Sequence, residues 1–216
     1  MTTLLFDNDG TLVDSEWLCN QALATILAQA GVQVDVGLLV RDYRGGKLAE
    51  IFSQLASRFA VQLPADSEAQ YRRLVSDLFA AQLRPIAGVV ATLDWATAAG
   101  MQLAVVSNGP QTKIRQALQI CGLSHYFADR VFSGYDINCF KPDGGLYQYA
   151  AAALGTAPAH CIVIEDSVPG IRAGLAAGCR TVFLNRYQEA KPDPAVLEVT
   201  TMAQLPAILQ ALVTRG

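Results

Sequence analysis

The length and composition of the chain limit what it can be before any motif is considered. Its 216 residues are enough for one large domain or two small ones, and a hydrophobic content of 52% allows a substantial core. The net charge of -3, without any block of basic residues, argues against nucleic acid or an anionic membrane as a partner. No apolar stretch reaches the roughly 18 to 20 residues of a membrane-spanning helix, and no signal peptide is recognisable. We therefore expect a cytoplasmic protein and, most simply, a monomer.

Short apolar runs rich in branched residues predict five strands that alternate with helical patterns. The strands are expected at residues 3–7, 103–107, 130–133, 162–165 and 181–184. Helices of this α/β part are expected at residues 89–99, 112–121, 145–154, 169–177 and 202–213. Such alternation is typical of a parallel sheet that is covered on both faces.

Residues 16–83 show helical periodicity and no strand pattern. Helices are expected there at residues 17–30, 48–59 and 66–83. A crossover this long between two strands predicts a second, all-helical domain inserted into the first. We therefore expect an α/β core domain formed by residues 1–14 and 85–216, and a helical domain formed by residues 15–84.

The first predicted strand runs into an acidic turn in which Asp7 and Asp9 stand two residues apart. Side chains at this spacing on a strand point the same way, so both carboxyl groups should face one pocket. Oxygen ligands of this kind suit Mg²⁺ better than zinc. The motif alone fits a catalytic pair or a capped Asp-Asn-Asp-Gly turn. It does not fit a calcium loop, because Leu5 stands where that loop has its first carboxylate.

Three later segments place polar side chains where other predicted strands end. Ser107 offers a hydroxyl and Asn108 a turn amide ahead of a helix, an arrangement that can hold phosphate oxygens. Lys141 offers a cation for an anionic substrate, although a lone lysine is usually a solvated surface group. Glu165 and Asp166 end a very apolar strand, where buried acids without a partner or a metal would be costly.

Taken in this order, the four segments resemble the four motifs of the haloacid dehalogenase-like (HAD) hydrolase superfamily. The resemblance implies a Rossmann-like parallel-sheet core, with the inserted helices as a cap domain of subclass I. It also implies a Mg²⁺-dependent phosphatase whose partner is a small phosphorylated metabolite, either a sugar phosphate or a sugar-acid phosphate. Three short strings, at residues 106–110, 132–137 and 166–168, resemble a bacterial subgroup of this family that acts on 6-phosphogluconate.

The resemblance also assigns roles to the matched residues. Asp7 would attack phosphorus and form an aspartyl-phosphate, and Asp9 would serve first as general acid and then as general base. The expected ligands of Mg²⁺ are Asp7, Asp9, Glu165 and Asp166. The expected partners of the phosphate oxygens are Ser107, Asn108 and Lys141.

Other functions on the same fold are weighed against this one. Sugar-phosphate mutases similar to β-phosphoglucomutase share the core and cap, but they carry a histidine where this chain has Cys19. Dehalogenases lack the second aspartate, whereas this chain has Asp9. An inactive phosphate-binding module is disfavoured, because each residue that the chemistry needs is present.

The segment at residues 41–47 combines cations, an aromatic ring and glycines between the first two expected helices of the inserted domain. This composition suits contact with a polar, anionic leaving group, so Arg44 and Lys47 are candidate substrate contacts; the alternative is a solvated loop. Asp14 and Glu16 have no role that the chemistry requires. The five cysteines are widely spaced and form no Cys-x-x-Cys pair, so we expect reduced thiols.

Overall fold

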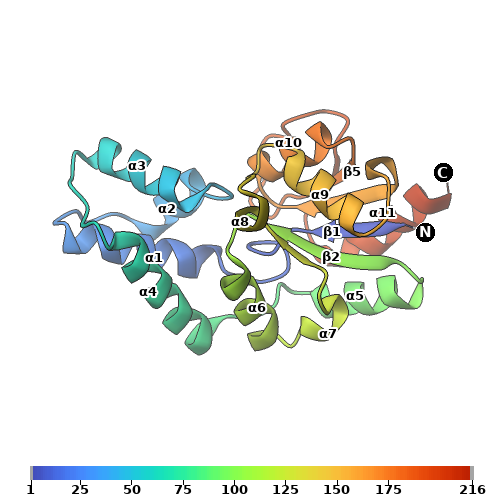
Figure 1. Cartoon of the computed structure of the whole chain (residues 1–216), viewed down its shortest axis with the longest axis horizontal. Helices are drawn as coiled ribbons and strands as arrows, with labels where there is room; N and C mark the ends of the chain where they lie inside the picture. The colour runs from blue at the N-terminus through green and yellow to red at the C-terminus, as the bar shows by residue number, and fades with distance from the viewer. Residues whose placement is uncertain (1, 215–216) are drawn as a thin grey trace.

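The structure is a computed structural model that describes residues 2–214, and a parallel sheet of six strands lies at its centre (Figure 1). The order of the strands is β3-β2-β1-β4-β5-β6. Their bounds are β1 (Thr3–Phe6), β2 (Gln102–Ser107), β3 (Val131–Ser133), β4 (Cys161–Glu165), β5 (Arg180–Leu184) and β6 (Leu197–Val199). The first five match the predicted strands, and the α/β fold class is confirmed. The sequence does not predict β6, a strand of three residues of which two are exposed.

The position of β1 explains why residues far apart in the sequence meet. It lies between β2 and β4, with Phe6 opposite Val105 on one side and Ile164 on the other. The chain proceeds from β1 to β2 and β3 in one direction and then returns to place β4 on the other side of β1. Parallel strands end at the same edge, and ligands of open α/β sheets bind at such a reversal of strand order. The residues that follow β1, β2 and β4 are therefore neighbours.

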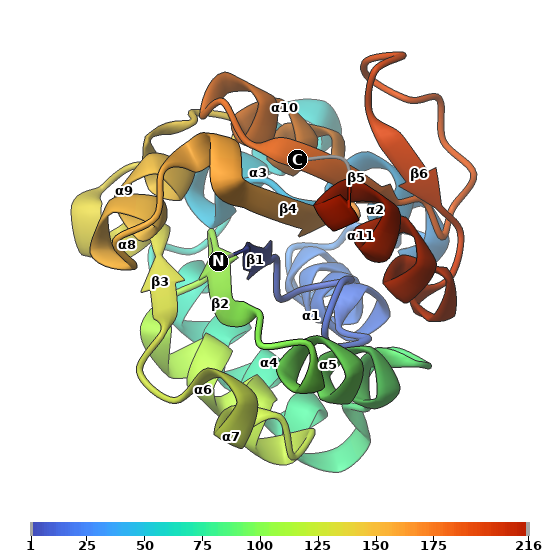
Figure 2. The same ribbon diagram turned by 90° about the vertical axis from the view of Figure 1, so that its right-hand side faces the viewer.

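Helices cover both faces of the sheet (Figures 1 and 2). One face packs against α5 (Val89–Ala98), α6 (Gln111–Ile120), α7 (Ser124–Phe127) and α11 (Leu205–Thr214). The other packs against α8 (Gly134–Ile137), α9 (Gly145–Ala153) and α10 (Val168–Ala176). Short 3₁₀ turns, η1 (Pro158–His160) and η2 (Met202–Gln204), precede β4 and α11. Leu4, Leu5 and Phe6 are fully buried between the two layers, which gives the first motif a rigid base.

The inserted segment forms a helical lobe beside the carboxyl edge of the sheet, seen on the left of Figure 1. Its helices are α1 (Glu16–Gln29), α2 (Val36–Asp42), α3 (Leu48–Phe59) and α4 (Ser67–Gln82). The chain enters and leaves the lobe side by side, where Val13 forms an isolated bridge with Pro85. All four helices lie within the predicted range 15–84; the domain boundaries themselves stay a prediction.

One local expectation for this lobe is wrong. Residues 41–47 are not a single loop, because Arg41 and Asp42 form the last turn of α2. The helix is short, and Asp35 caps its start by accepting a hydrogen bond of 3.0 Å from the Leu38 amide. The connection between α2 and α3 therefore consists of residues 43–47.

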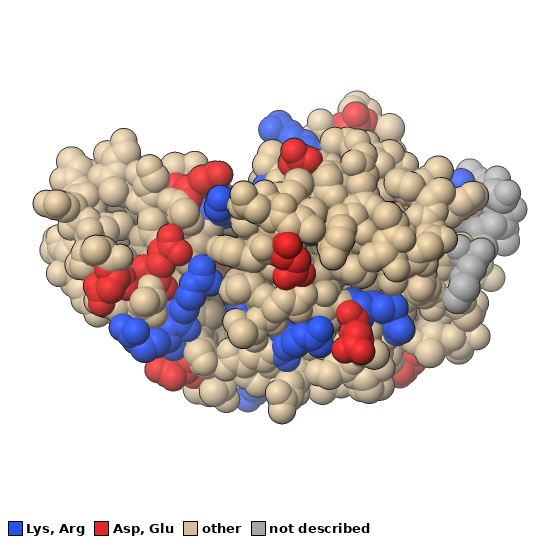
Figure 3. Space-filling view, viewed as in Figure 1, with Lys and Arg blue, Asp and Glu red and all other residues tan. Residues whose placement is uncertain are grey.

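The helices, the charged surface and the cysteines of the described residues can be compared with the expectations from composition. None of their helices combines the length and apolarity that a bilayer span requires. On the face drawn in Figure 3, positive and negative side chains are interspersed and no broad positive area is present. All five cysteines are free thiols, as expected.

Candidate active site

A cavity of about 100 Å³ lies between the carboxyl edge of the sheet and the helical lobe. We call its base the floor, which consists of Asp7, Ser107, Lys141, Glu165 and Asp166, all from the core. From the lobe, the cavity is lined by Glu16, Cys19, Asn20, Tyr43, Gly45, Tyr71 and Arg72, among others. The structure thus brings four sequence segments to one place, as the sequence predicts for the carboxyl edge of a parallel sheet.

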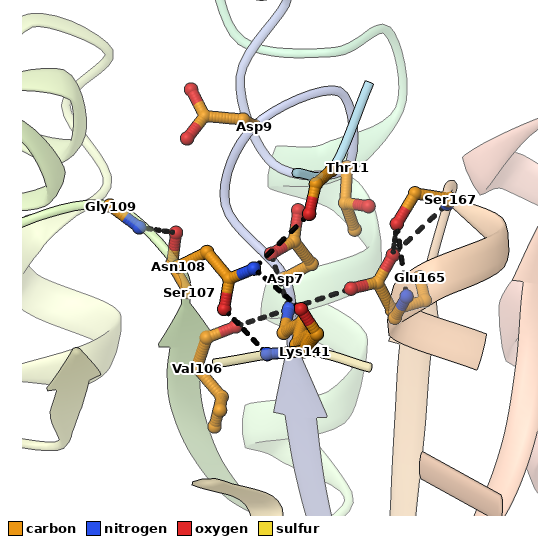
Figure 4. A network of polar contacts seen from close by, with 12 residues as sticks. Asp7, Asp9, Thr11, Val106, Ser107, Asn108, Gly109, Lys141, Glu165 and Ser167 are labelled. Atoms are coloured by element: carbon orange, nitrogen blue, oxygen red, sulfur yellow. Dashed lines mark hydrogen bonds and ion pairs between the residues drawn. The ribbon is translucent and has the colours of Figure 1, made fainter. Parts of the chain in front are cut away.

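Lys141 is the centre of the floor (Figure 4). Its ammonium lies 2.6 Å from Asp7 Oδ1, 2.6 Å from Glu165 Oε1 and 2.8 Å from the Val106 carbonyl oxygen. Burial by itself would lower the pKa of Lys141, but Asp7 and Glu165 outweigh it and hold this pKa well above its usual value. The side chain is 2% exposed, so the reading of Lys141 as a solvated surface group is wrong.

The two acids after β4 have different surroundings. Glu165 Oε2 accepts hydrogen bonds from the Ser167 amide and hydroxyl, at 3.0 and 2.9 Å, while Oε1 faces Lys141. Asp166 accepts one hydrogen bond, from the Thr11 hydroxyl at 3.2 Å, and its Oδ2 is buried without any hydrogen-bond partner among the described residues. Glu165 is thus held in place by the protein, whereas Asp166 Oδ2 accepts no hydrogen bond among the described residues and lies 3.8 Å from Arg44 Nη1.

This acidic group is suited to a hard divalent cation. Oxygens of Asp7, Glu165 and Asp166 lie within 4.8 Å of one another. Burial, followed by the charges of Glu16 and Glu165, raises the pKa of Asp166 well above its usual value. Burial and the neighbouring acids likewise raise the pKa of Asp7, against the opposing charge of Lys141. A cation among these oxygens would offset the repulsion between the carboxylates and give Asp166 Oδ2 a partner. The residues therefore fit a metal site.

Ser107 and Asn108 follow β2 at the side of the floor. The Ser107 hydroxyl is buried and accepts a hydrogen bond of 3.1 Å from the Gly109 amide. The Asn108 side chain accepts from the Lys141 amide at 2.8 Å and donates to the Lys141 carbonyl at 3.2 Å. It also donates to the carbonyl of Gly45 in the lobe, at 3.1 Å. Asn108 therefore fixes the backbone of Lys141 and joins the core to the lobe, a role that the sequence does not reveal.

Asp9 faces away from the floor (Figure 4). Its Oδ1 accepts hydrogen bonds from the Ser15 hydroxyl at 2.6 Å and from Lys113 Nζ at 2.8 Å. Burial would raise the pKa of Asp9, but the charge and the hydrogen bond of Lys113 outweigh it and lower the pKa. Lys113 is on α6, six residues after Ser107, and sequence analysis overlooks it.

The two candidate contacts in residues 43–47 lie beside the cavity rather than in its lining. Arg44 is 5% exposed; it forms an ion pair with Glu189 of the core and stacks on the Tyr187 ring, whose centroid is 3.9 Å from Cζ. Its Nη1 lies 3.8 Å from Asp166 Oδ2 and donates no hydrogen bond within the described residues. Lys47 Nζ lies 4.4 Å from the Phe140 ring centroid. Substrate contact by either residue stays a prediction.

Glu16, for which the sequence predicts no role that the chemistry requires, is buried beside the proposed catalytic residues. It is 6% exposed and lines the cavity beside Asp9 and Lys113. Burial, followed by the charge of Asp9, raises the pKa of Glu16 to about 8. By contrast, Asp14 lies outside the cavity lining and pairs with Arg186 at 3.0 Å. We call Asp9, Glu16, Arg44 and Lys113 the boundary cluster, because they lie where the core meets the lobe.

Comparison with known proteins agrees with this geometry. A family model described as haloacid dehalogenase-like hydrolase matches residues 1–178. The chain belongs to the haloacid dehalogenase-like hydrolase family. Among curated relatives, this HAD-like hydrolase is 36% identical to the 6-phosphogluconate phosphatase of Escherichia coli K12, over 96% of this chain and 94% of the relative. It is 32% identical to hexitol phosphatase A of the same organism, over 84% of this chain and 82% of the relative.

Solved structures place the HAD-like hydrolase in the same fold. A HAD family hydrolase from Deinococcus radiodurans R1, crystallised with bound phosphate and sodium, superimposes with a TM-score of 0.78 at 29% identity, covering 98% of this chain and 96% of that one. The β-phosphoglucomutase of Clostridium difficile superimposes with a TM-score of 0.85 at 18% identity, over 100% and 98% of the two chains. At that identity the second likeness concerns the fold alone, so it gives no support to mutase activity.

Proposed function

We propose that this HAD-like hydrolase is a Mg²⁺-dependent phosphatase that hydrolyses a small phosphorylated metabolite through an aspartyl-phosphate intermediate. The observation that carries the proposal is the floor, where Asp7 is held by a buried lysine and faces two further acids. Relatives that are named phosphatases of 6-phosphogluconate and of hexitol phosphates support the substrate class.

Asp7 is the proposed nucleophile. Its Oδ1 is fixed by Lys141 at 2.6 Å, and its backbone amide donates to the Ile164 carbonyl at 2.9 Å, so the carboxylate is oriented before substrate arrives. Such orientation favours attack, because the entropy of placing the nucleophile is already lost when the protein folds and not when the substrate reacts. Ser107, the Asn108 amide and Lys141 supply donors and positive charge for the phosphate oxygens.

Asp9 is the proposed acid and base, and Asp7, Asp166 and the Asp9 carbonyl are the proposed metal ligands, with Glu165 assisting. When bound, Mg²⁺ would supply positive charge that offsets repulsion between the carboxylate of Asp7 and the phosphate. Asp9 would donate a proton to the leaving oxygen, then remove one from the water that hydrolyses the intermediate. To do so its carboxyl must turn from Ser15 and Lys113 toward the floor.

Release of inorganic phosphate tests the proposal. Purified protein would be incubated with p-nitrophenyl phosphate and a panel of sugar, sugar-acid and polyol phosphates, with Mg²⁺ or with a chelator. We expect phosphate release with Mg²⁺, its loss in chelator and its recovery when Mg²⁺ is restored. Absence of release from every substrate in the presence of Mg²⁺ would refute the proposal.

A sugar-phosphate mutase is the alternative, and its product separates it from a phosphatase. Cys19, at the position where such mutases carry a histidine, is 8% exposed in α1, and burial raises its pKa to about 12. A thiol with that pKa stays neutral and is a poor substitute for a histidine that exchanges protons near pH 7. Incubation with a hexose 1-phosphate should yield phosphate and no isomeric sugar phosphate; accumulation of the isomer would favour the mutase.

A further inference from the structure

Lys113 contacts Asp9 from the core side of the boundary between the two domains. It belongs to α6, and its Nζ donates to Asp9 Oδ1 at 2.8 Å, on the same oxygen that accepts from the Ser15 hydroxyl at 2.6 Å. Figure 4 shows the Asp9 carboxylate pointing away from Asp7 and Lys141. In this position Asp9 cannot serve a leaving oxygen above Asp7. Catalysis therefore requires that Asp9 leave Lys113.

The departure of Asp9 would leave Lys113 in need of another anion. Its side chain is only 21% exposed, and within the described residues Asp9 is the acceptor of its one hydrogen bond. The Phe79 ring, with its centroid 5.6 Å from Nζ, lies nearby. Glu16 is in the same wall of the cavity, where the Asn20 side chain donates to its carboxylate at 3.5 Å. A largely buried ammonium without an acceptor is costly, so the turn of Asp9 is favoured when a ligand supplies one.

A second pocket beside Lys113 has room for a ligand that carries such an acceptor. It has a volume of about 210 Å³, lies between α4 of the lobe and α6 of the core, and shares Tyr71, Arg72, Pro110 and Lys113 with the catalytic cavity. Its remaining lining includes Ser76, Thr112 and Gln116. The pocket therefore combines two cations with hydroxyl and amide groups, a lining that suits a hydroxylated chain ending in a carboxylate.

We propose that Lys113 is a positioning and specificity residue that exchanges Asp9 for a carboxylate of the substrate. Lys113 holds Asp9 away from the floor until the end of the leaving group remote from phosphorus enters the α4–α6 pocket. The substrate carboxylate then binds Lys113, and Asp9 turns to the leaving oxygen. The class of substrate is an open-chain sugar acid phosphorylated at the opposite end. This inference rests on the proposed phosphatase function. It adds that a carboxylate of the substrate displaces Asp9 from Lys113, so that Asp9 can reach the leaving oxygen.

Two substrates of equal length isolate the carboxylate. They are 6-phosphogluconate and the hexitol 6-phosphate that carries a hydroxymethyl group in place of the carboxylate. A third, p-nitrophenyl phosphate, has a leaving group that departs without a proton, so its first step needs no general acid, whereas hydrolysis of the aspartyl-phosphate still uses Asp9 as base. The variants are Lys113→Met, Lys113→Arg and, as matched control, Arg115→Met, an exposed cation on the same helix that donates to Gln111.

Lys113→Met is expected to change turnover of the two six-carbon substrates in opposite directions. Lys113→Met should lower kcat/KM for the sugar acid by about 10- to 100-fold, because a charge-assisted hydrogen bond is lost. It should raise kcat for the hexitol phosphate, since Asp9 is no longer held by Lys113. Lys113→Arg should keep most of the preference of wild type for the acid. Arg115→Met should match wild type on all three substrates.

The result that overturns the inference differs from the one that overturns the function. If Lys113→Met lowers kcat/KM equally for all three substrates, Lys113 has a purely structural role. If the ratio of kcat/KM for the sugar acid to that for the hexitol phosphate is unchanged, Lys113 does not recognise the carboxylate. Absence of any preference in the wild-type enzyme would also refute the inference. In each of these cases the wild-type enzyme still releases phosphate. Only a wild-type protein inactive on all three substrates with Mg²⁺ would refute the phosphatase function itself.

Discussion

The floor of the cavity and the boundary cluster both combine carboxylates with a cation, but they are held in different ways. In the floor, the ammonium of Lys141 has three acceptors within 2.8 Å, and all three belong to the core. In the boundary cluster, Arg44 of the lobe forms an ion pair with Glu189 of the core, and Lys113 holds Asp9, the carboxylate that the proposed mechanism requires to move. The floor is therefore held by contacts within the core, whereas the boundary cluster includes a contact between the two domains.

The largest effect is expected from Lys141→Met, which tests whether this lysine holds Asp7 and Glu165 in position in the floor. Loss of the ammonium leaves Asp7 and Glu165 buried without their partner, so we expect loss of activity by more than about 1,000-fold and destabilisation by about 3 to 5 kcal/mol. Denaturant unfolding in chelator and phosphate release measure the two effects. The control is Arg115→Met, which removes an exposed cation from α6. Near-normal stability of Lys141→Met would mean that the floor does not depend on this ion pair.

Asp166→Asn should separate metal binding from folding. The buried Oδ2 of Asp166 has no hydrogen-bond partner within the described residues, and Glu16 and Glu165 repel its charge. We expect the Mg²⁺ concentration for half-maximal activity to rise by about 10- to 100-fold. In chelator, thermal unfolding should show the variant at least as stable as wild type. A variant that is less stable without metal, or that needs no more Mg²⁺, would contradict a cation site at this residue.

The floor and the boundary cluster also differ in how far the sequence predicts them. Asp7, Ser107, Glu165 and Asp166 lie at the last residue of an apolar strand or directly after it, and the parallel sheet brings these ends together, so a local pattern was enough. Lys113 looks like any polar residue on an amphipathic helix, because its contact with Asp9, 104 residues away in the sequence, depends on how α6 packs beside the end of β1. Glu16 begins the first helix of the lobe, and only packing shows that its side chain turns inward.

The same physical reason explains the errors in secondary structure. The helix α2 and the strand β6 are short, and their stability comes from neighbours distant in the sequence rather than from a periodic apolar pattern. Strands β1, β2 and β4 are buried on both faces and show continuous apolar runs. Prediction from sequence therefore succeeded where burial is complete and failed for β6, at one edge of the sheet, and for α2 in the lobe.

A smaller effect is expected from Glu189→Gln, which tests the contact of the boundary cluster between the domains. The substitution removes the charge that pairs with the buried guanidinium of Arg44. We expect KM to rise by roughly 3- to 10-fold, because closure of the lobe over substrate loses about 1 kcal/mol or slightly more. Asp193→Asn, in the same loop, is the control and should leave KM unchanged. An unchanged KM in Glu189→Gln would show that Arg44 does not need this partner.

The smallest effect concerns Glu16 and the pH dependence of stability. Because burial raises its pKa to about 8, the native protein retains a proton that the unfolded chain releases from about pH 5 upward. The native state then binds more protons, so the free energy of unfolding should fall as pH rises, by up to about 1.4 kcal/mol per unit of pH. Unfolding in chelator at pH 5 and pH 7 should show a shallower fall for Glu16→Gln than for wild type. The control Glu50→Gln, exposed on α3, should follow wild type; an equal slope in all three proteins would contradict the burial of an uncompensated Glu16.

Asp7→Asn tests the central claim most directly. The substitution keeps the size of the side chain and a group that can meet Lys141, but it removes the carboxylate that attacks phosphorus. With Mg²⁺ and either p-nitrophenyl phosphate or the preferred substrate of the wild-type enzyme, the account predicts that phosphate release falls to background while the protein stays folded. Appreciable Mg²⁺-dependent turnover by Asp7→Asn would contradict the assignment of Asp7 as the nucleophile.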